Sequence, residues 1–232
     1  MNRRSKINGL FFVSLLSCAL AAPAFAANRQ PTVVELFTSQ GCSSCPPANA
    51  NLITISKNPD VLALSFAVTY WDRLGWKDTF GRPEFTERQI TYEPGLNQNS
   101  AFTPQVVVNG SVTGVGNSLP ELQSLMASAP ALSGPAMVFG KGRIEIGNGP
   151  KHDSAEVWLV NYDPRTVSTR VGSGENGGVT LLHANVVHHL EKLGTWNGQS
   201  ASFHLPSPRS GMKAAVLLQR PNGGKILSAI TQ

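Results

Sequence analysis

Apolar residues in the first half of the chain form short runs of strand type that alternate with helical segments. Residues 33–38 (Val-Val-Glu-Leu-Phe-Thr) are β-branched or aromatic around one acid, which predicts a buried strand. Asn109-Gly110 predicts a tight hairpin turn, and Ser118 with Glu121 predicts a capping box at a helix start. Further strands are predicted at 61–70, 105–109 and 111–114, and helices at 48–56, 84–92 and 119–129. The first two strands are expected to be parallel and joined by a right-handed crossover.

Residues 130–135 begin and end with proline and separate this region from one with a different pattern. Beyond them, short β-type runs alternate with Gly, Asn, Asp and Pro, and helical periodicity is lacking. About seven strands at such spacing predict an all-β sandwich-like domain. The expected strands are 143–146, 156–161, 167–171, 179–187, 201–204, 214–219 and 226–230.

The first residues are typical of a targeting segment. Arg3, Arg4 and Lys6 precede an apolar run over 10–22, and Ala24-Phe25-Ala26 fits the small-x-small cleavage pattern. We expect cleavage after Ala26. The chain is then divided into a signal peptide (1–26), a first α/β domain (27–131) and a β-rich second domain (132–232). The alternative is a lipoprotein anchored at Cys18, because Leu-Leu-Ser-Cys loosely resembles a lipobox.

Removal of this segment changes the picture given by the whole-chain composition. The formal net charge of +5 owes much to the three basic residues near the start, so the mature chain is nearly neutral. Clusters of Lys and Arg with interleaved aromatics are lacking, which argues against nucleic-acid binding. We expect a periplasmic or secreted protein, with membrane contact only through lipidation or a redox partner. Disulfides persist in such compartments.

Cys42-Ser43-Ser44-Cys45 is the motif with the most specific chemistry, because it lies between a predicted buried strand and a predicted helix. A helix start carries unpaired N–H groups and partial positive charge, which favour a thiolate. Pro46 and Pro47 lack N–H groups and fit the first helical turn. We expect the amides of Ser44 and Cys45 to face the Cys42 sulfur. Cys42 is then the more exposed, attacking thiol, and Cys45 resolves the mixed disulfide.

Two other interpretations of this motif remain open. A static disulfide in a non-catalytic binding module is the first, although such a short loop constrains the unfolded chain little. Copper(I) binding or delivery by the two thiolates, supported by a histidine, is the second, whereas two thiolates fall short of a zinc site. The histidines available are His152, His183, His188, His189 and His204. The motif indicates no cofactor.

Glu35 lies inside the first apolar strand, where a carboxyl group is costly unless it is neutralised or hydrogen-bonded. Burial raises the pKa of an acid, so Glu35 is a candidate for proton exchange in catalysis. The alternative is that Glu35 faces a polar loop or the second domain.

Residues 33–38 with the CxxC resemble the active-site strand of thioredoxin and of the periplasmic disulfide oxidases, which carry a buried acid upstream of their first cysteine. Thr103-Pro104 resembles the cis-proline loop of that superfamily. The mature chain also resembles, over nearly its whole length, a family of secreted bacterial proteins of unknown function. Its motifs are found at 35–48, 70–78, 103–110, 174–177, 185–187 and 193–196. The resemblance implies an α/β thioredoxin-like domain followed by an all-β sandwich-like domain.

These features predict that three separate segments meet at one end of the sheet: Cys42–Cys45, Tyr70–Asp78 and Phe102–Pro104. Ligands gather at the carboxyl ends of parallel strands, and an antiparallel third strand begins at the same edge. We expect a cis Pro104 that presents the Thr103 backbone to an extended substrate chain.

The tryptophans and one acid of the second segment are candidate site residues. Trp71 and Trp76 offer apolar contact area or simply pack in the core, and Asp72 is a proton acceptor or a turn cap. Together these predictions indicate a thiol–disulfide oxidoreductase whose partners are protein or small-molecule thiols and disulfides.

Overall fold

The computed structural model describes residues 30–150, 153–206 and 210–232. The predicted signal peptide, Cys18 and His152 lie outside these residues. In the described part no helix is long and apolar enough to cross a membrane.

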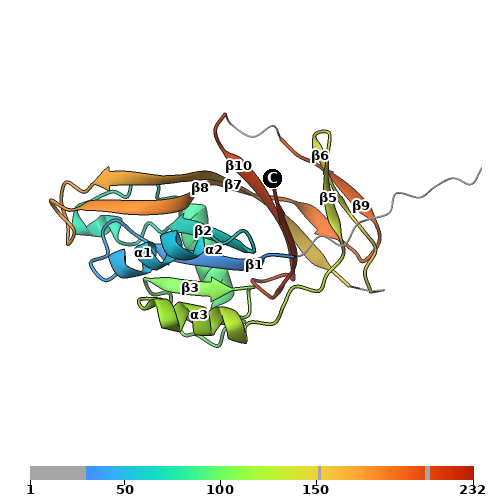
Figure 1. Ribbon diagram of the computed structural model, residues 1–232, viewed down its shortest axis with the longest axis horizontal. Helices are drawn as coiled ribbons and strands as arrows, with labels where there is room; N and C mark the ends of the chain where they lie inside the picture. Colours follow the sequence, from blue (N-terminus) through green and yellow to red (C-terminus); the bar gives the residue numbers. More distant parts are fainter. Residues whose placement is uncertain (1–29, 151–152, 207–209) are drawn as a thin grey trace, which may run out of the picture.

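The first half of the chain builds one side of a sheet (Figure 1). Strand β1 pairs in parallel with β2 and antiparallel with β3, which continues through the Asn109-Gly110 turn into β4. Both directions and the hairpin are confirmed. The strands are β1 (Thr32–Thr38), β2 (Val61–Ala67), β3 (Gln105–Val108) and β4 (Val112–Gly114). The helices are α1 (Pro46–Ile55), the short 3-10 helix η1 (Asp72–Leu74), α2 (Pro83–Tyr92) and α3 (Leu119–Ser128). The predicted cap is also confirmed, since Ser118 Oγ accepts a hydrogen bond from the Glu121 amide.

Helices cover both faces of β1, which explains its continuous burial. Val34 and Leu36 belong to the core under α1 and α3, whereas Val33 and Phe37 belong to the core under α2. Successive side chains of a strand point to opposite faces, so Glu35 points to the α2 face.

The second half continues the same sheet. Strand β8 pairs in parallel with β2 through Ser65 and Val186, and β7, β10 and β11 follow. The order of the eight strands is β11-β10-β7-β8-β2-β1-β3-β4. A separate three-stranded sheet, β5-β6-β9, packs at one end of the molecule (Figure 1). These strands are β5 (Met137–Gly140), β6 (Arg143–Ile146), β7 (Ala155–Arg170), β8 (Thr180–Trp196), β9 (Ala201–His204), β10 (Lys213–Gln219) and β11 (Ile226–Thr231).

The predicted fold class, a thioredoxin-like α/β domain followed by an all-β sandwich-like domain, is therefore wrong. Four strands of each half form one large mixed sheet, and helices are few. The physical reason is the free edge of β2. Its backbone groups and its apolar residues Leu62, Leu64 and Phe66 need a neighbour, and β8 supplies it from the second half.

Strands β7 and β8 form an unusually long hairpin that the sequence pattern divides into shorter pieces. The predicted strands 156–161 and 167–171 fall in β7 apart from Val171, and β7 continues through a register shift between Asp163 and Thr166. A bulge of this kind absorbs the Asp163-Pro164 pair without ending the strand. The hairpin arm extends along α1 and ends beyond the sheet (Figure 1).

His183 is a buried histidine on β8. Its side chain packs edge-on against Phe80, with ring centroids 5.7 Å apart, and its Nε2 atom has no hydrogen-bond partner. Burial lowers the pKa of His183 from 6.5 to about 4, because the charged imidazolium is poorly solvated there.

This pKa shift predicts acid-sensitive stability. The unfolded chain binds the proton near pH 6.5 and the folded chain only near pH 4, so the free energy of unfolding should fall as the pH drops through that window. The decrease in the free energy of unfolding should reach about 3 kcal/mol. Urea titrations of the wild type and His183→Phe between pH 4 and 7 measure it. A wild type and a variant with the same pH dependence would contradict the assignment.

Candidate functional site

Cys42 and Cys45 form a disulfide at the start of α1. Cys45 is the N-cap residue, and Pro46 and Pro47 occupy the first helical turn as predicted. The Cys45 amide donates to the Cys42 carbonyl oxygen at 3.2 Å, so it is not free to face the Cys42 sulfur as expected. The Ser44 hydroxyl lies 3.4 Å from that sulfur instead.

The two cysteines do not differ in exposure. Each has 0 % exposed surface, whereas Ser43 and Ser44 between them are exposed. The prediction that Cys42 is the more exposed residue is therefore wrong for this oxidised state. Segments from elsewhere in the chain pack around the cysteine loop (residues 39–45) and bury its two cysteines.

The segment around Thr103 is the first of these neighbours. The Thr103–Pro104 peptide bond is cis, as predicted. The Ser44 hydroxyl lies 3.4 Å from the Thr103 carbonyl oxygen, and the Trp71 indole N–H donates to Thr103 Oγ1 at 2.7 Å. Gln89 of α2 holds the preceding residue by donating to the Phe102 carbonyl oxygen. Cys42, Trp71, Thr103 and Pro104 thus lie together at one end of the sheet.

The segment 70–78, which includes Trp71, also packs against the cysteine loop through Gln40. The Trp76 indole N–H donates to the side-chain oxygen Oε1 of Gln40 at 2.9 Å. The backbone N–H of Gln40 donates to the Asp78 carboxylate at 2.7 Å. Asp72 accepts from the Asp78 amide, which places it as a turn cap. Burial raises the pKa of Asp78. Asp78 belongs to the family motif at residues 70–78, but no residue near it in the sequence indicates its buried contact with Gln40.

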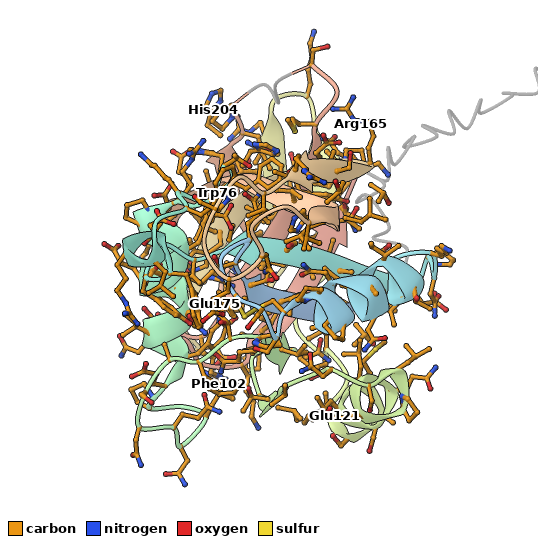
Figure 2. The ribbon with its side chains drawn as sticks, turned by 90° about the vertical axis from the view of Figure 1, so that its left-hand side faces the viewer. Trp76, Phe102, Glu121, Arg165, Glu175 and His204 are labelled. Carbon is orange, nitrogen blue, oxygen red and sulfur yellow. A yellow bond between two sulfur atoms is a disulfide. The ribbon has the colours of Figure 1, made fainter. Side chains whose placement is uncertain are left out.

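The tip of the β7–β8 hairpin (residues 171–179) is the third neighbour. Glu175 Oε2 accepts from the Ser43 amide at 3.1 Å and from the Ser43 hydroxyl at 2.7 Å. Asn176 Nδ2 donates to the carbonyl oxygens of Gln40, at 2.9 Å, and Cys42, at 2.8 Å. Figure 2 views the molecule from the end to which the hairpin tip extends, and labels Glu175 of the tip, Trp76 and Phe102. The tip carries the family motif at residues 174–177, but its long-range contacts with the cysteine loop have no local sequence signal.

Glu35 belongs to a separate buried network on the α2 face. Its carboxylate accepts from Arg88 Nε at 2.6 Å and from the Tyr92 hydroxyl, while Gln219 of β10 contacts both Arg88 and Tyr92. Burial by itself lowers the pKa of Arg88, but the adjacent Glu35 raises it above its usual range. Burial raises the pKa of Tyr92. Both carboxylate oxygens of Glu35 are thus occupied by structural partners, on the face opposite to α1.

We predict that Glu35 acts on stability rather than on the cysteines. Glu35→Gln leaves the buried Arg88 charge without its hydrogen-bonded counter-ion and should lower the free energy of unfolding by roughly 3–5 kcal/mol. The double variant Glu35→Leu/Arg88→Met should recover much of that loss, because no charge is left unpaired. Chemical denaturation measures stability, and the equilibrium with glutathione measures the effect on the disulfide. A large change in that equilibrium would instead support the catalytic role.

The histidines give the copper interpretation no support in the part of the chain described here, where no three His, Cys, Asp or Glu side chains group to hold a metal. His183 and His188 both pack edge-on against the Phe80 ring.

Fold and site together define a mixed α/β protein with a CxxC disulfide covered by a long β-hairpin. Residues 33–219 match the family described as "Protein of unknown function (DUF1223)", and the chain belongs to that family. The predicted resemblance to a family of proteins of unknown function is confirmed at this level. No match is found among curated proteins.

Two solved structures are similar to this chain. The crystal structure of protein AGR_C_4864 from Agrobacterium tumefaciens is 31% identical, with 89% of this chain and 95% of that chain covered and a TM-score of 0.71. HBP35 of Porphyromonas gingivalis is 12% identical, with 88% of this chain and 75% of that chain covered and a TM-score of 0.57. At that identity the second similarity concerns the fold alone.

Proposed function

We propose that this protein is a thiol–disulfide oxidoreductase that works outside the cytoplasm on protein or small-molecule thiols and disulfides. The observation that carries the proposal is the Cys42–Cys45 pair at the start of a helix, with the Thr103–Pro104 backbone and Trp71 next to it. The apparent signal sequence supports an exported location, where such a disulfide persists.

The pair can exchange electrons with a dithiol substrate in two steps. A substrate thiolate attacks the Cys42 sulfur, a new S–S bond forms, and Cys45 leaves as a thiolate that takes up a proton. A second substrate thiolate then attacks the substrate sulfur of this mixed disulfide and expels Cys42. The substrate loses two electrons and becomes a disulfide, and the protein becomes a dithiol; reduction of a substrate follows the reverse path.

Neighbouring groups suit this exchange. The Ser44 hydroxyl can donate to the Cys42 sulfur and stabilise a thiolate there. The exposed Ser43 and Ser44 mark the side from which a substrate reaches the loop. Trp71, anchored on Thr103, supplies half-buried aromatic surface beside it.

Complete burial of both cysteines favours a second candidate, a static disulfide in a binding module. The reduction potential separates the two. A catalytic pair should have a potential well above about −300 mV, whereas a static disulfide should lie below it. Equilibration of the intact mature protein with glutathione or dithiothreitol buffers gives this value, and a potential below that limit would reject the proposal.

We predict that single-cysteine variants differ in trapping. Cys45→Ser leaves the attacking Cys42 without a resolving thiol, so mixed disulfides with partners should accumulate. Cys42→Ser should trap little. Non-reducing gels with mass spectrometry measure the adducts, and the double variant Cys42→Ser/Cys45→Ser is the control. Equal trapping by both single variants, or by neither, would count against the mechanism.

A further inference from the structure

The hairpin tip contacts the cysteine loop through a buried asparagine. Asn176 is 6% exposed, although its neighbours in the tip are exposed. A side-chain amide has two N–H donors, and the Nδ2 atom of Asn176 contacts two acceptors, the carbonyl oxygens of Gln40 and Cys42. One side chain therefore holds the backbone on both sides of Gly41 and directly at Cys42.

The tip is itself fixed in place, so Asn176 acts from a rigid support. Backbone hydrogen bonds from Val171 to Val179 and from Gly178 to Val171 close it. The Ser173 hydroxyl donates to the Gly75 carbonyl oxygen at 2.6 Å. Gly172 lies against the Trp76 ring so closely that a Cβ atom there would be 2.7 Å from Cζ3.

Holding the loop in this way favours the oxidised state. The two sulfurs bond only in a narrow range of backbone geometries, and a loop already fixed in one of them loses less conformational entropy when the bond closes. After reduction the same hydrogen bonds resist the separation of the two sulfurs. The loss of the Asn176 contacts should therefore cost the disulfide form more than the dithiol form.

Glu175 favours the same state through its charge. Hydrogen bonds from the Ser43 hydroxyl and amide lower the pKa of Glu175, so the group is a carboxylate at neutral pH. Ser43 follows Cys42 directly, and a negative charge here disfavours a second negative charge on a Cys42 thiolate. Because Glu175 is exposed, salt should screen this effect.

We propose that Asn176 and Glu175, carried by the β7–β8 hairpin, are positioning residues that set the redox equilibrium of the Cys42–Cys45 pair toward the disulfide. The proposal deepens the proposed function and rests on it only in requiring that the disulfide can be reduced in the folded protein. The relevant reaction is protein disulfide plus two glutathione thiols giving protein dithiol plus glutathione disulfide, a two-electron exchange.

The test measures this equilibrium for the full mature chain in glutathione buffers at low and high salt. Asn176→Ala should favour the dithiol by about tenfold, which is about 30 mV, at both salt concentrations. Glu175→Gln should favour it by about two- to threefold at low salt, with a lower Cys42 pKa, and the effect should vanish at high salt. Asn176→Ser, which keeps one donor, should lie between the wild type and Asn176→Ala.

A matched control is available on the same hairpin. Asn185 Nδ2 donates to the Ala63 carbonyl oxygen, and Asn185 has a positive φ that glycine tolerates. Asn185→Gly removes a comparable contact away from the cysteines and should lower the stability of oxidised and reduced protein alike. Its equilibrium with glutathione should stay at the wild-type value.

The outcomes separate this inference from the proposed function. An Asn176→Ala equilibrium within twofold of the wild type, or a Glu175→Gln effect that salt does not alter, would overturn the inference. If Asn176→Ala does not fold, Asn176→Ser and the surface variant Glu175→Gln decide by the same criteria. A protein that shows these shifts but does not catalyse exchange with a model peptide disulfide would reject the proposed function and leave the inference intact.

Discussion

The pairing of β8 with the edge of β2 is the interaction on which the rest of the structure depends. It joins the strands of the two halves in one sheet, and it satisfies backbone groups of a strand whose residues are almost all buried. It also fixes the direction of the β7–β8 arm. The arm emerges along α1 and places its tip over the cysteine loop, so the site depends on the same junction as the core.

A buried polar network also spans the two halves of the chain. Arg88 and Tyr92 of α2 meet Glu35 of β1 and Gln219 of β10, which belong to opposite halves of the chain. Arg88 also lies over the rings of Phe66 and Trp158. A buried charge tolerates few alternative arrangements, so this network favours one alignment of the halves over other apolar packings.

Local signals in the sequence were sufficient for much of the first half. The strand at 33–38, the Asn109-Gly110 turn and the Ser118 cap each depend on neighbouring residues, and each is present in the structure. The meeting of Cys42, Trp71 and Thr103 followed from strand direction. The β2–β8 pairing did not, because the partner of a strand edge leaves no mark in either strand. Asp163-Pro164 is typical of a strand end in sequence. The bulge that carries this pair forms only because β8 pairs with β7 on both sides of it. Asn176 resembled an ordinary turn residue for the same reason, since its acceptors lie far away in the chain.

The distance in sequence between the cysteines and the hairpin tip has a consequence for biosynthesis. The cysteines are three positions apart and near the start of the described residues, whereas the tip residues that contact their loop follow more than a hundred positions later. Contacts that are local form earlier than contacts across such a separation, and the amino-terminal part emerges first. While the chain folds, the thiols are therefore accessible before the tip can dock. Oxidants and reductants therefore reach Cys42 and Cys45 most easily in that interval. The completed fold then buries the resulting disulfide.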